Sequence, residues 1–186
     1  MYHPLDGTDQ ARLEEQAVSG PRQQKTLRTR RREIMAISNE EMLKRIARFN
    51  QLMPMDYRQM RGGEEAARSI KGFSVIGHVT KDPPAIAGDH GFTLALQKVQ
   101  PGKGATLHSH TVVEVFVPLS GRWKFFWGED GKGEAELGPW DTISFPAGIM
   151  EGFQNIGDEE AALLVVLGGP DVGEITYRKS EEQPTA

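Results

Sequence analysis

The chain has 186 residues, of which 38% are hydrophobic and 26% are charged, so it can form one hydrophobic core with an extension. Its formal net charge of -4 provides no overall attraction to nucleic acid or to an anionic membrane, and neither is expected as a partner. The absence of cysteine excludes disulfides, thiolate metal ligands and a cysteine nucleophile.

Residues 1–34 are predicted to be a disordered basic tail or extension. They are polar, with only scattered apolar residues, and cannot bury enough surface to offset the entropy of an ordered chain. Met35 is a plausible translation start, in which case the upstream residues are an extension. No stretch forms a signal peptide or approaches the roughly eighteen apolar residues of a membrane span, so a cytoplasmic location is the default expectation.

Residues 35–71 are predicted to form N-terminal helices. Ser38 and Glu41 have the spacing of a capping box, and apolar residues then recur at helical spacing, which predicts an amphipathic helix ending before Pro54. A second helix is predicted from about Pro54 to Ser69, interrupted near two glycines. We expect these helices to pack outside a larger core or in a subunit interface, and the chain to form a homodimer.

The sequence pattern of residues 72–180 predicts an all-β domain, and residues 181–186 are predicted to be a C-terminal tail. Short apolar runs alternate with turns that are rich in glycine and proline. Strands are predicted at 73–79, 92–99, 106–119, 122–127, 133–137, 141–145, 152–155, 162–167 and 174–178. Many short strands without intervening helices favour an antiparallel sandwich or barrel of the jelly-roll kind. The nearly continuous apolar run at 162–167 predicts a strand buried on both faces.

One segment, PGKGATLHSHTVVEVFVPLSG, carries a pattern typical of a metal site. His108 and His110 are two residues apart and would project from the same face of a strand, and Glu114 has the same parity if no bulge intervenes. The surrounding valines and phenylalanine leave no clearly solvated face, so these polar side chains need partners. Two imidazoles and one carboxylate match a ligand set used for divalent first-row metals.

The same residues resemble the first motif of the cupin superfamily without a gap. The matching positions are Gly102, His108, His110, Glu114 and Gly121. The second cupin motif is matched at Pro146, Gly148 and Asn155 but differs at Trp140, where the family has glycine, and at Glu151, where it has histidine. This resemblance implies an all-β, cupin-type jelly-roll barrel with an N-terminal helical extension.

The resemblance also implies a divalent metal held inside the barrel by His108, His110 and Glu114. Glu151 occupies the position of a fourth ligand, and three roles are open to it. It could coordinate the metal, it could act as a catalytic base or hydrogen-bond acceptor beside a three-ligand metal, or the site could have lost its metal. Fe or Mn is favoured by the share of oxygen ligands, with Zn and Ni as alternatives.

The function predicted from this resemblance is that of a metal-dependent enzyme acting on a small organic molecule. A dioxygenase or related oxidoreductase for an oxygen-chelating substrate is the first hypothesis, and an isomerase or lyase is an alternative. A further alternative is a small-molecule binding or sensing domain with a vestigial metal site, because one fold supports many functions.

Overall fold

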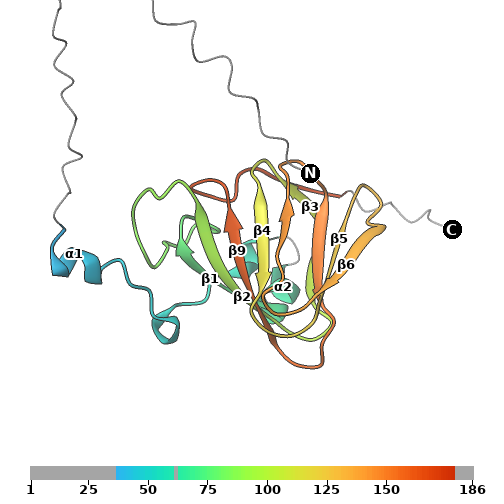
Figure 1. Cartoon of the computed structure of the whole chain (residues 1–186), viewed down its shortest axis with the longest axis horizontal. Coiled ribbons are helices and arrows are strands. Elements are labelled where there is room, and N and C mark those ends of the chain that lie inside the picture. The colour runs from blue at the N-terminus through green and yellow to red at the C-terminus, as the bar shows by residue number, and fades with distance from the viewer. Residues whose placement is uncertain (1–36, 61–62, 179–186) are drawn as a thin grey trace, which may run out of the picture. The chain divides into compact units, whose positions relative to one another are not determined.

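The computed structural model describes residues 37–60 and 63–178. These residues form two five-stranded antiparallel sheets that pack against each other, with strand orders β1-β2-β9-β4-β7 and β10-β3-β8-β5-β6 (Figure 1). The strands are β1 (Ile70–Ile76), β2 (Thr93–Val99), β3 (Gly104–His110), β4 (Glu114–Pro118), β5 (Trp123–Trp127), β6 (Gly133–Leu137), β7 (Ile143–Phe145), β8 (Glu151–Asn155), β9 (Ala161–Leu167) and β10 (Ile175–Tyr177). The predicted all-β jelly-roll fold is confirmed.

The core lies between the two sheets and is rich in aromatic side chains. Phe116 from one sheet packs against Phe125 and Phe153 from the other, with ring centroids 5.3 and 5.4 Å apart. All three side chains are buried, as is Trp123. Burial of such large side chains is the main force that holds two sheets face to face.

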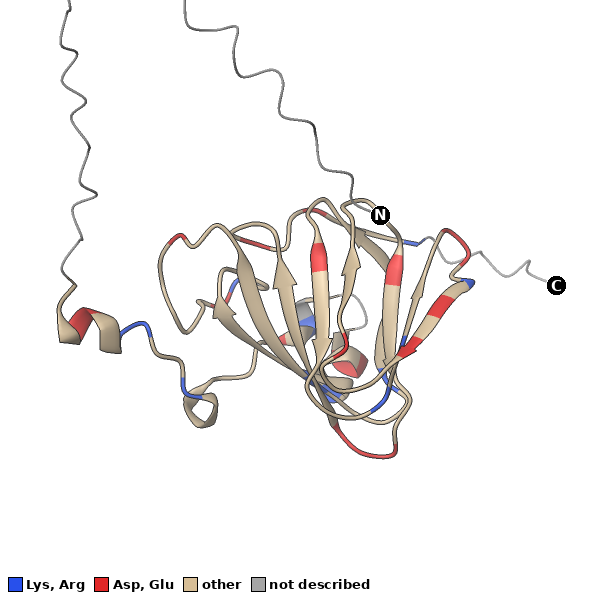
Figure 2. Cartoon of the chain, in the orientation of Figure 1, with Lys and Arg blue, Asp and Glu red and all other residues tan. Residues whose placement is uncertain are grey.

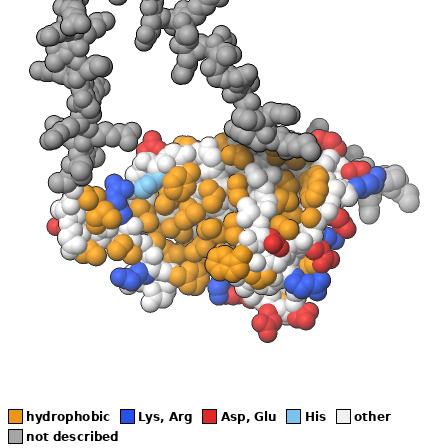
Figure 3. All heavy atoms as spheres, viewed as in Figure 1, with side chains coloured by type: hydrophobic (Ala, Val, Ile, Leu, Met, Phe, Trp, Pro, Cys, Tyr) orange, Lys and Arg blue, Asp and Glu red, His pale blue; other side chains and the backbone are white. Residues whose placement is uncertain are grey.

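Strand β9 differs from the prediction that it is buried on both faces. Its residues alternate between fully buried and half-buried, because only one face looks into the barrel. Leu164 and Val166 lie on the outer face, where Figure 3 shows apolar side chains gathered over the sheet that contains β1, β9 and β4. An apolar outer face is compatible with the homodimer expected from the sequence, which stays a prediction.

The N-terminal helices are shorter than predicted. Helix α1 (Asn39–Leu43) begins with the expected capping box, in which the Ser38 hydroxyl accepts a hydrogen bond from the backbone N–H of Glu41. The helix ends after five residues, and only the 3-10 turn η1 (Phe49–Gln51) follows before Pro54. The apolar side chains of α1 are exposed, and Leu43 is 56% exposed. A helix without a packing surface gains too little stability to extend further along the chain.

The predicted second helix is divided into the 3-10 turn η2 (Tyr57–Gln59) and helix α2 (Gly63–Ser69). Strand β1 then begins at Ile70, within the region predicted to be helical, because Ile70 pairs with Val99 of β2. The predicted tails at 1–34 and 181–186 lie outside the described residues. No helix among the described residues is long and apolar enough to cross a membrane.

Asn155 ties the end of β8 to two neighbouring segments. Its side-chain amide donates to the carbonyls of Val99 (2.9 Å) and Glu159 (2.8 Å), and its side-chain oxygen accepts from the N–H of Gly157 (2.9 Å). Because the side chain is fully buried, Asn155→Ala would leave these groups without partners. We expect a loss of about 3 kcal/mol of unfolding free energy, measured by urea denaturation.

The matched control is Gln154→Ala. Gln154 is the preceding residue, and its half-buried side chain donates a single hydrogen bond to the carbonyl of Gly102 at 3.0 Å. We expect this variant to lose about 1 kcal/mol or less. Equal losses in the two variants would contradict the structural role assigned to Asn155.

Candidate metal centre

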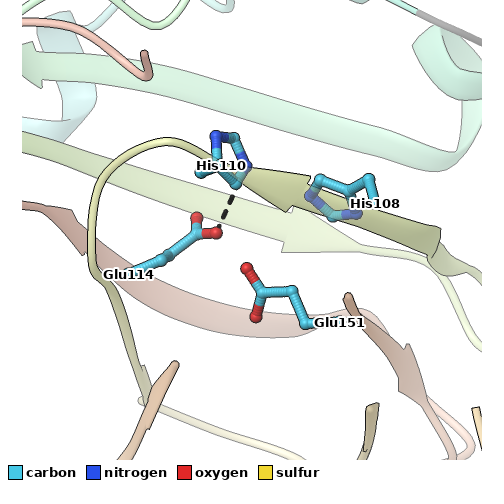
Figure 4. A group of neighbouring side chains, drawn as sticks. All are labelled: His108, His110, Glu114 and Glu151. Carbon is cyan, nitrogen blue, oxygen red and sulfur yellow. Dashed lines mark ion pairs between the residues drawn. The ribbon is translucent and has the colours of Figure 1, made fainter. Parts of the chain in front are cut away.

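Four side chains from three strands converge on one point (Figure 4). His108 and His110 lie on β3, Glu114 begins β4 and Glu151 begins β8. One potential ligand atom from each residue lies within 4.8 Å of those of the other three. The structure therefore brings together all four residues that the sequence nominated as metal ligands.

Strand pairing explains the position of three of the four residues. His108 lies directly opposite Glu151 across the β3–β8 ladder, so both side chains point from the same face of the sheet. His110 is two residues further along β3 and shares that face. The turn before β8 is fixed by a hydrogen bond from the N–H of Gly148 to the carbonyl of His110 at 2.8 Å.

Glu114 reaches the site by a route that the sequence analysis did not predict. The predicted strand at 106–119 is two strands, because β3 ends at His110 and the chain crosses to the opposite sheet before β4. Glu114 therefore does not share a strand with His108 and His110, as strand parity predicted, although it does face the histidines. An acidic residue at the beginning of β4 is visible in Figure 2, and its carboxylate approaches the imidazoles from across the barrel.

The hydrogen bonds of the two imidazoles fix which nitrogen faces the centre. Nδ1 of His108 lies 2.8 Å from the Thr106 carbonyl, and Nδ1 of His110 lies 2.8 Å from the Val172 carbonyl. A carbonyl only accepts, so each Nδ1 carries the proton and donates, which leaves the Nε2 lone pair for a metal. Burial lowers the pKa of His108 and further favours the neutral imidazole that a metal requires.

The two carboxylates are buried with unsatisfied oxygens. Glu114 is 5% exposed and Glu151 is 2% exposed, and Oε2 of each has no hydrogen-bond partner among the described residues. Burial, together with the neighbouring Glu114 carboxylate, raises the pKa of Glu151 far above its ordinary range. Such a pair needs either a shared proton or a cation to be stable.

The short distance between His110 and Glu114 also indicates that a positive charge is needed at this centre. Nε2 of His110 lies 3.3 Å from Oε2 of Glu114 (Figure 4). An imidazole lone pair and a carboxylate oxygen repel at this distance unless a positive charge lies close to both. Two neutral imidazoles and two carboxylates would neutralise a divalent ion, so these residues fit a metal in both donor type and charge.

The centre borders a cavity of about 1100 Å³. His108, His110 and Glu114 line one part of it, and apolar side chains such as Ala95, Val165 and Leu167 line another. Such a volume accommodates a small organic molecule. A ligand in this cavity can therefore reach the imidazoles and the Glu114 carboxylate while its apolar part contacts the barrel wall.

Three polar residues of the cavity were not identified from the sequence. Tyr177 lies opposite His108 in the β10–β3 ladder and stacks on its ring, with centroids 5.8 Å apart. Tyr57 and Gln97 line the cavity from η2 and β2. Only the strand pairing of β10 could have indicated Tyr177, and no local pattern distinguishes Tyr57 or Gln97 from ordinary packing residues.

The sequence of residues 95–167 matches a family model described as a cupin domain, and this range contains all four residues of the candidate centre. No curated protein matches the chain significantly. Among solved structures, the DMSP lyase DddQ from Ruegeria pomeroyi DSS-3 is similar, with a TM-score of 0.56 and 20% identity over 70% of this chain. The alignment covers 64% of the lyase chain, slightly less than two thirds of its length.

Two further structures have the same fold. The polyketide cyclase RemF from Streptomyces resistomycificus has a TM-score of 0.57 and 19% identity, covering 75% of this chain and 88% of the cyclase. An oxalate oxidase has a TM-score of 0.50 and 15% identity, covering 71% of this chain and 62% of the oxidase. At these identities the comparisons establish a shared fold.

Proposed function

Because this chain belongs to the cupin superfamily, we propose that it is a metal-dependent enzyme whose divalent ion is held by His108, His110, Glu114 and Glu151. The observation that carries this proposal is the convergence of four ligand atoms within 4.8 Å around two carboxylate oxygens that lack partners among the described residues. Two nitrogen and two oxygen ligands favour Fe or Mn, with Zn and Ni as alternatives. The substrate is a small organic molecule bound in the adjoining cavity.

A bound divalent ion would act as a Lewis acid toward an oxygen-chelating substrate and, in the case of iron, would support dioxygen chemistry. The residues of the chain have separate tasks. The carbonyls of Thr106 and Val172 orient the two imidazoles through Nδ1. The apolar walls exclude water from the bound substrate, which strengthens every polar interaction in the site.

Within this proposal, an oxygenase or related oxidoreductase is the first assignment. It is supported by the imidazole and carboxylate ligands, which suit a redox-active metal. A lyase or isomerase is the second, because a divalent ion beside Glu151 would hold its carboxylate ionised, and an ionised carboxylate can accept a proton. The similar structures include a lyase, a cyclase and an oxidase, so the fold is compatible with both assignments.

Oxygen uptake by the reconstituted protein tests the assignment. The protein is loaded with Fe(II), Mn(II), Ni(II) or Zn(II) and incubated with catechols, enols and 1,3-diketones, with dissolved oxygen and products measured. We expect the iron- or manganese-loaded protein to consume oxygen with at least one substrate, and His108→Ala to lose at least about 99% of that rate, as expected when a metal ligand is removed. His90→Ala, outside the candidate centre, is the matched control and should keep the rate of the parent protein.

Product formation without oxygen uptake would overturn the oxygenase assignment and support the lyase or isomerase. If the protein bound a substrate but did not turn it over with any of the four metals, the proposal of an enzyme would be wrong. The remaining hypothesis would be a small-molecule binding or sensing domain. Activity retained in His108→Ala would contradict the assignment of the centre.

A further inference from the structure

A second polar group lies in the same cavity and is separate from the four candidate ligands. Nε2 of Gln97 donates to the hydroxyl of Tyr57 at 3.1 Å, and both residues line the cavity. Oε1 of Gln97 is buried and has no hydrogen-bond partner among the described residues. If the amide is turned over, Nε2 becomes the atom without a partner, so one polar atom is unsatisfied in either orientation.

The backbone holds this pair in place. Tyr57 is 5% exposed, and its ring lies against Gly72 of β1, the residue paired with Gln97 across the β1–β2 ladder. A Cβ atom at Gly72 would overlap the tyrosine ring and its hydroxyl, so the absence of a side chain there creates the space that Tyr57 occupies. The Tyr57 ring thus packs against β1 at the residue that pairs with Gln97.

The backbone of Gln97 is displaced along the sheet from the level of the candidate metal centre. Thr93 of β2 and Glu114 of β4 both pair with Leu167 of β9, so these residues share one level of the sheet. Gln97 is four residues further along β2, which corresponds to about 13 Å along the strand. Between the two levels the cavity wall is apolar and includes Ala95 and Val165.

The Tyr57 hydroxyl indicates which group fits there. While it accepts the hydrogen bond from Gln97, its own proton is free to be donated to an oxygen of a ligand; if the amide is turned over, Tyr57 donates to Gln97 and its oxygen is free to accept. A ligand hydroxyl can accept in the first case and donate in the second, so it pairs with Tyr57 in either amide orientation. Burial raises the pKa of Tyr57, so its hydroxyl keeps the proton that it would donate.

We propose that Gln97 and Tyr57 form a hydroxyl-binding subsite for an alcohol or phenol whose apolar body lies along the cavity wall. Resting on the proposed function, this subsite defines a substrate class. The substrate is an elongated apolar molecule with a hydroxyl at one end and an oxygen-chelating group at the other, near the four candidate ligands.

Phenol and toluene are suitable probes, because they have similar shapes and differ in the hydroxyl group. Their dissociation constants for the chelator-treated full-length protein are measured by NMR titration. We expect phenol to bind at least about 5-fold more tightly than toluene, as one satisfied buried hydrogen bond implies. Tyr57→Phe and Gln97→Leu should each reduce this preference to less than about 2-fold while toluene affinity is retained, which shows that the cavity is intact.

Tyr177→Phe is the matched control, because Tyr177 lines the cavity beside His108 instead of beside Gln97. It should keep the preference for phenol. Equal affinities of the parent protein for the two probes, a preference that survives in both Tyr57→Phe and Gln97→Leu, or a loss confined to Tyr177→Phe would each overturn the subsite. Because the titration is done without metal, it tests the subsite separately from the proposal that the four residues bind a metal.

Discussion

His110→Ala is expected to reduce the affinity of the protein for a divalent metal by at least about 100-fold. The substitution removes the Nε2 lone pair that lies 3.3 Å from the Glu114 carboxylate, and it leaves the Val172 carbonyl without its imidazole donor. Loss of a residue that only orients a ligand typically costs 10- to 100-fold in metal affinity, and loss of the ligand itself costs more. Competition with a fluorescent chelator measures the dissociation constants.

The matched control for this prediction is His90→Ala. His90 is a half-buried histidine outside the candidate centre. Its ring nitrogen lies 3.4 Å from the carbonyl of Ala87 and its ring contacts Phe92, so its removal should leave metal affinity unchanged. If His110→Ala bound Fe, Mn, Ni or Zn as tightly as the parent protein does, the residues assigned to the centre would be wrong.

Glu151→Gln is expected to change stability in opposite directions in the metal-free and metal-loaded proteins. Burial raises the pKa of Glu151 above the value of 4.5 that it has in an unfolded chain, so the fold favours the protonated side chain. Stability from this group is therefore fully present below about pH 4.5 and falls as pH rises toward the folded pKa, by up to about 1.4 kcal/mol per pH unit. Glutamine has no such charge and should remove this dependence.

Urea unfolding between pH 5 and pH 8 measures the effect. We expect the metal-free parent to lose about 2 kcal/mol or more over this range relative to metal-free Glu151→Gln. In the metal-loaded state the order should reverse, because the substitution removes a charged oxygen ligand and weakens metal binding. Parallel pH profiles for the two metal-free proteins would contradict a buried, unpaired carboxylate at this position.

The same position separates a ligand from a base. If Glu151 coordinates the metal, Glu151→His should retain a metal with altered selectivity, because imidazole ligates the same ions. Glu151→Gln should then bind metal more weakly. Unchanged metal affinity in Glu151→Gln together with lost turnover would instead identify Glu151 as a general base.

The barrel strands could be predicted because their sequences carry strong local signals. The segment at 133–137 was predicted with the bounds that β6 has, since turn residues enclose it on both sides. The N-terminal helix was overestimated for the opposite reason. Its apolar spacing at Met42 and Ile46 suits a helix, but both side chains are exposed among the described residues, and helical spacing alone does not supply a surface to pack against.

The candidate centre was predictable only in part. His108 and His110 share a strand, so their spacing alone implies a common face. Glu114 and Glu151 come from other strands. Strand parity grouped Glu114 with the histidines although it lies on a separate strand, and only the resemblance to a known motif placed Glu151 beside them. Tyr57 and Gln97 meet through the pairing of β1 with β2, a long-range property that no local pattern contains.

Trp140 differs from the second cupin motif and is nevertheless accommodated by the fold. It replaces the glycine of the second cupin motif, and its φ of 73° lies in the left-handed region that favours glycine. The side chain is 78% exposed, so it avoids any clash with the core. A glycine would adopt this backbone conformation without strain, and the tryptophan adopts it at a cost of about 1–2 kcal/mol.

The most direct test of the metal centre is the anomalous diffraction of crystals grown from metal-reconstituted protein, with data collected on both sides of the metal absorption edge. The account predicts one metal per chain, bounded by Nε2 of His108 and His110 and by carboxylate oxygens of Glu114 and Glu151. Absence of anomalous density among these four residues after reconstitution with Fe, Mn, Ni and Zn would contradict it.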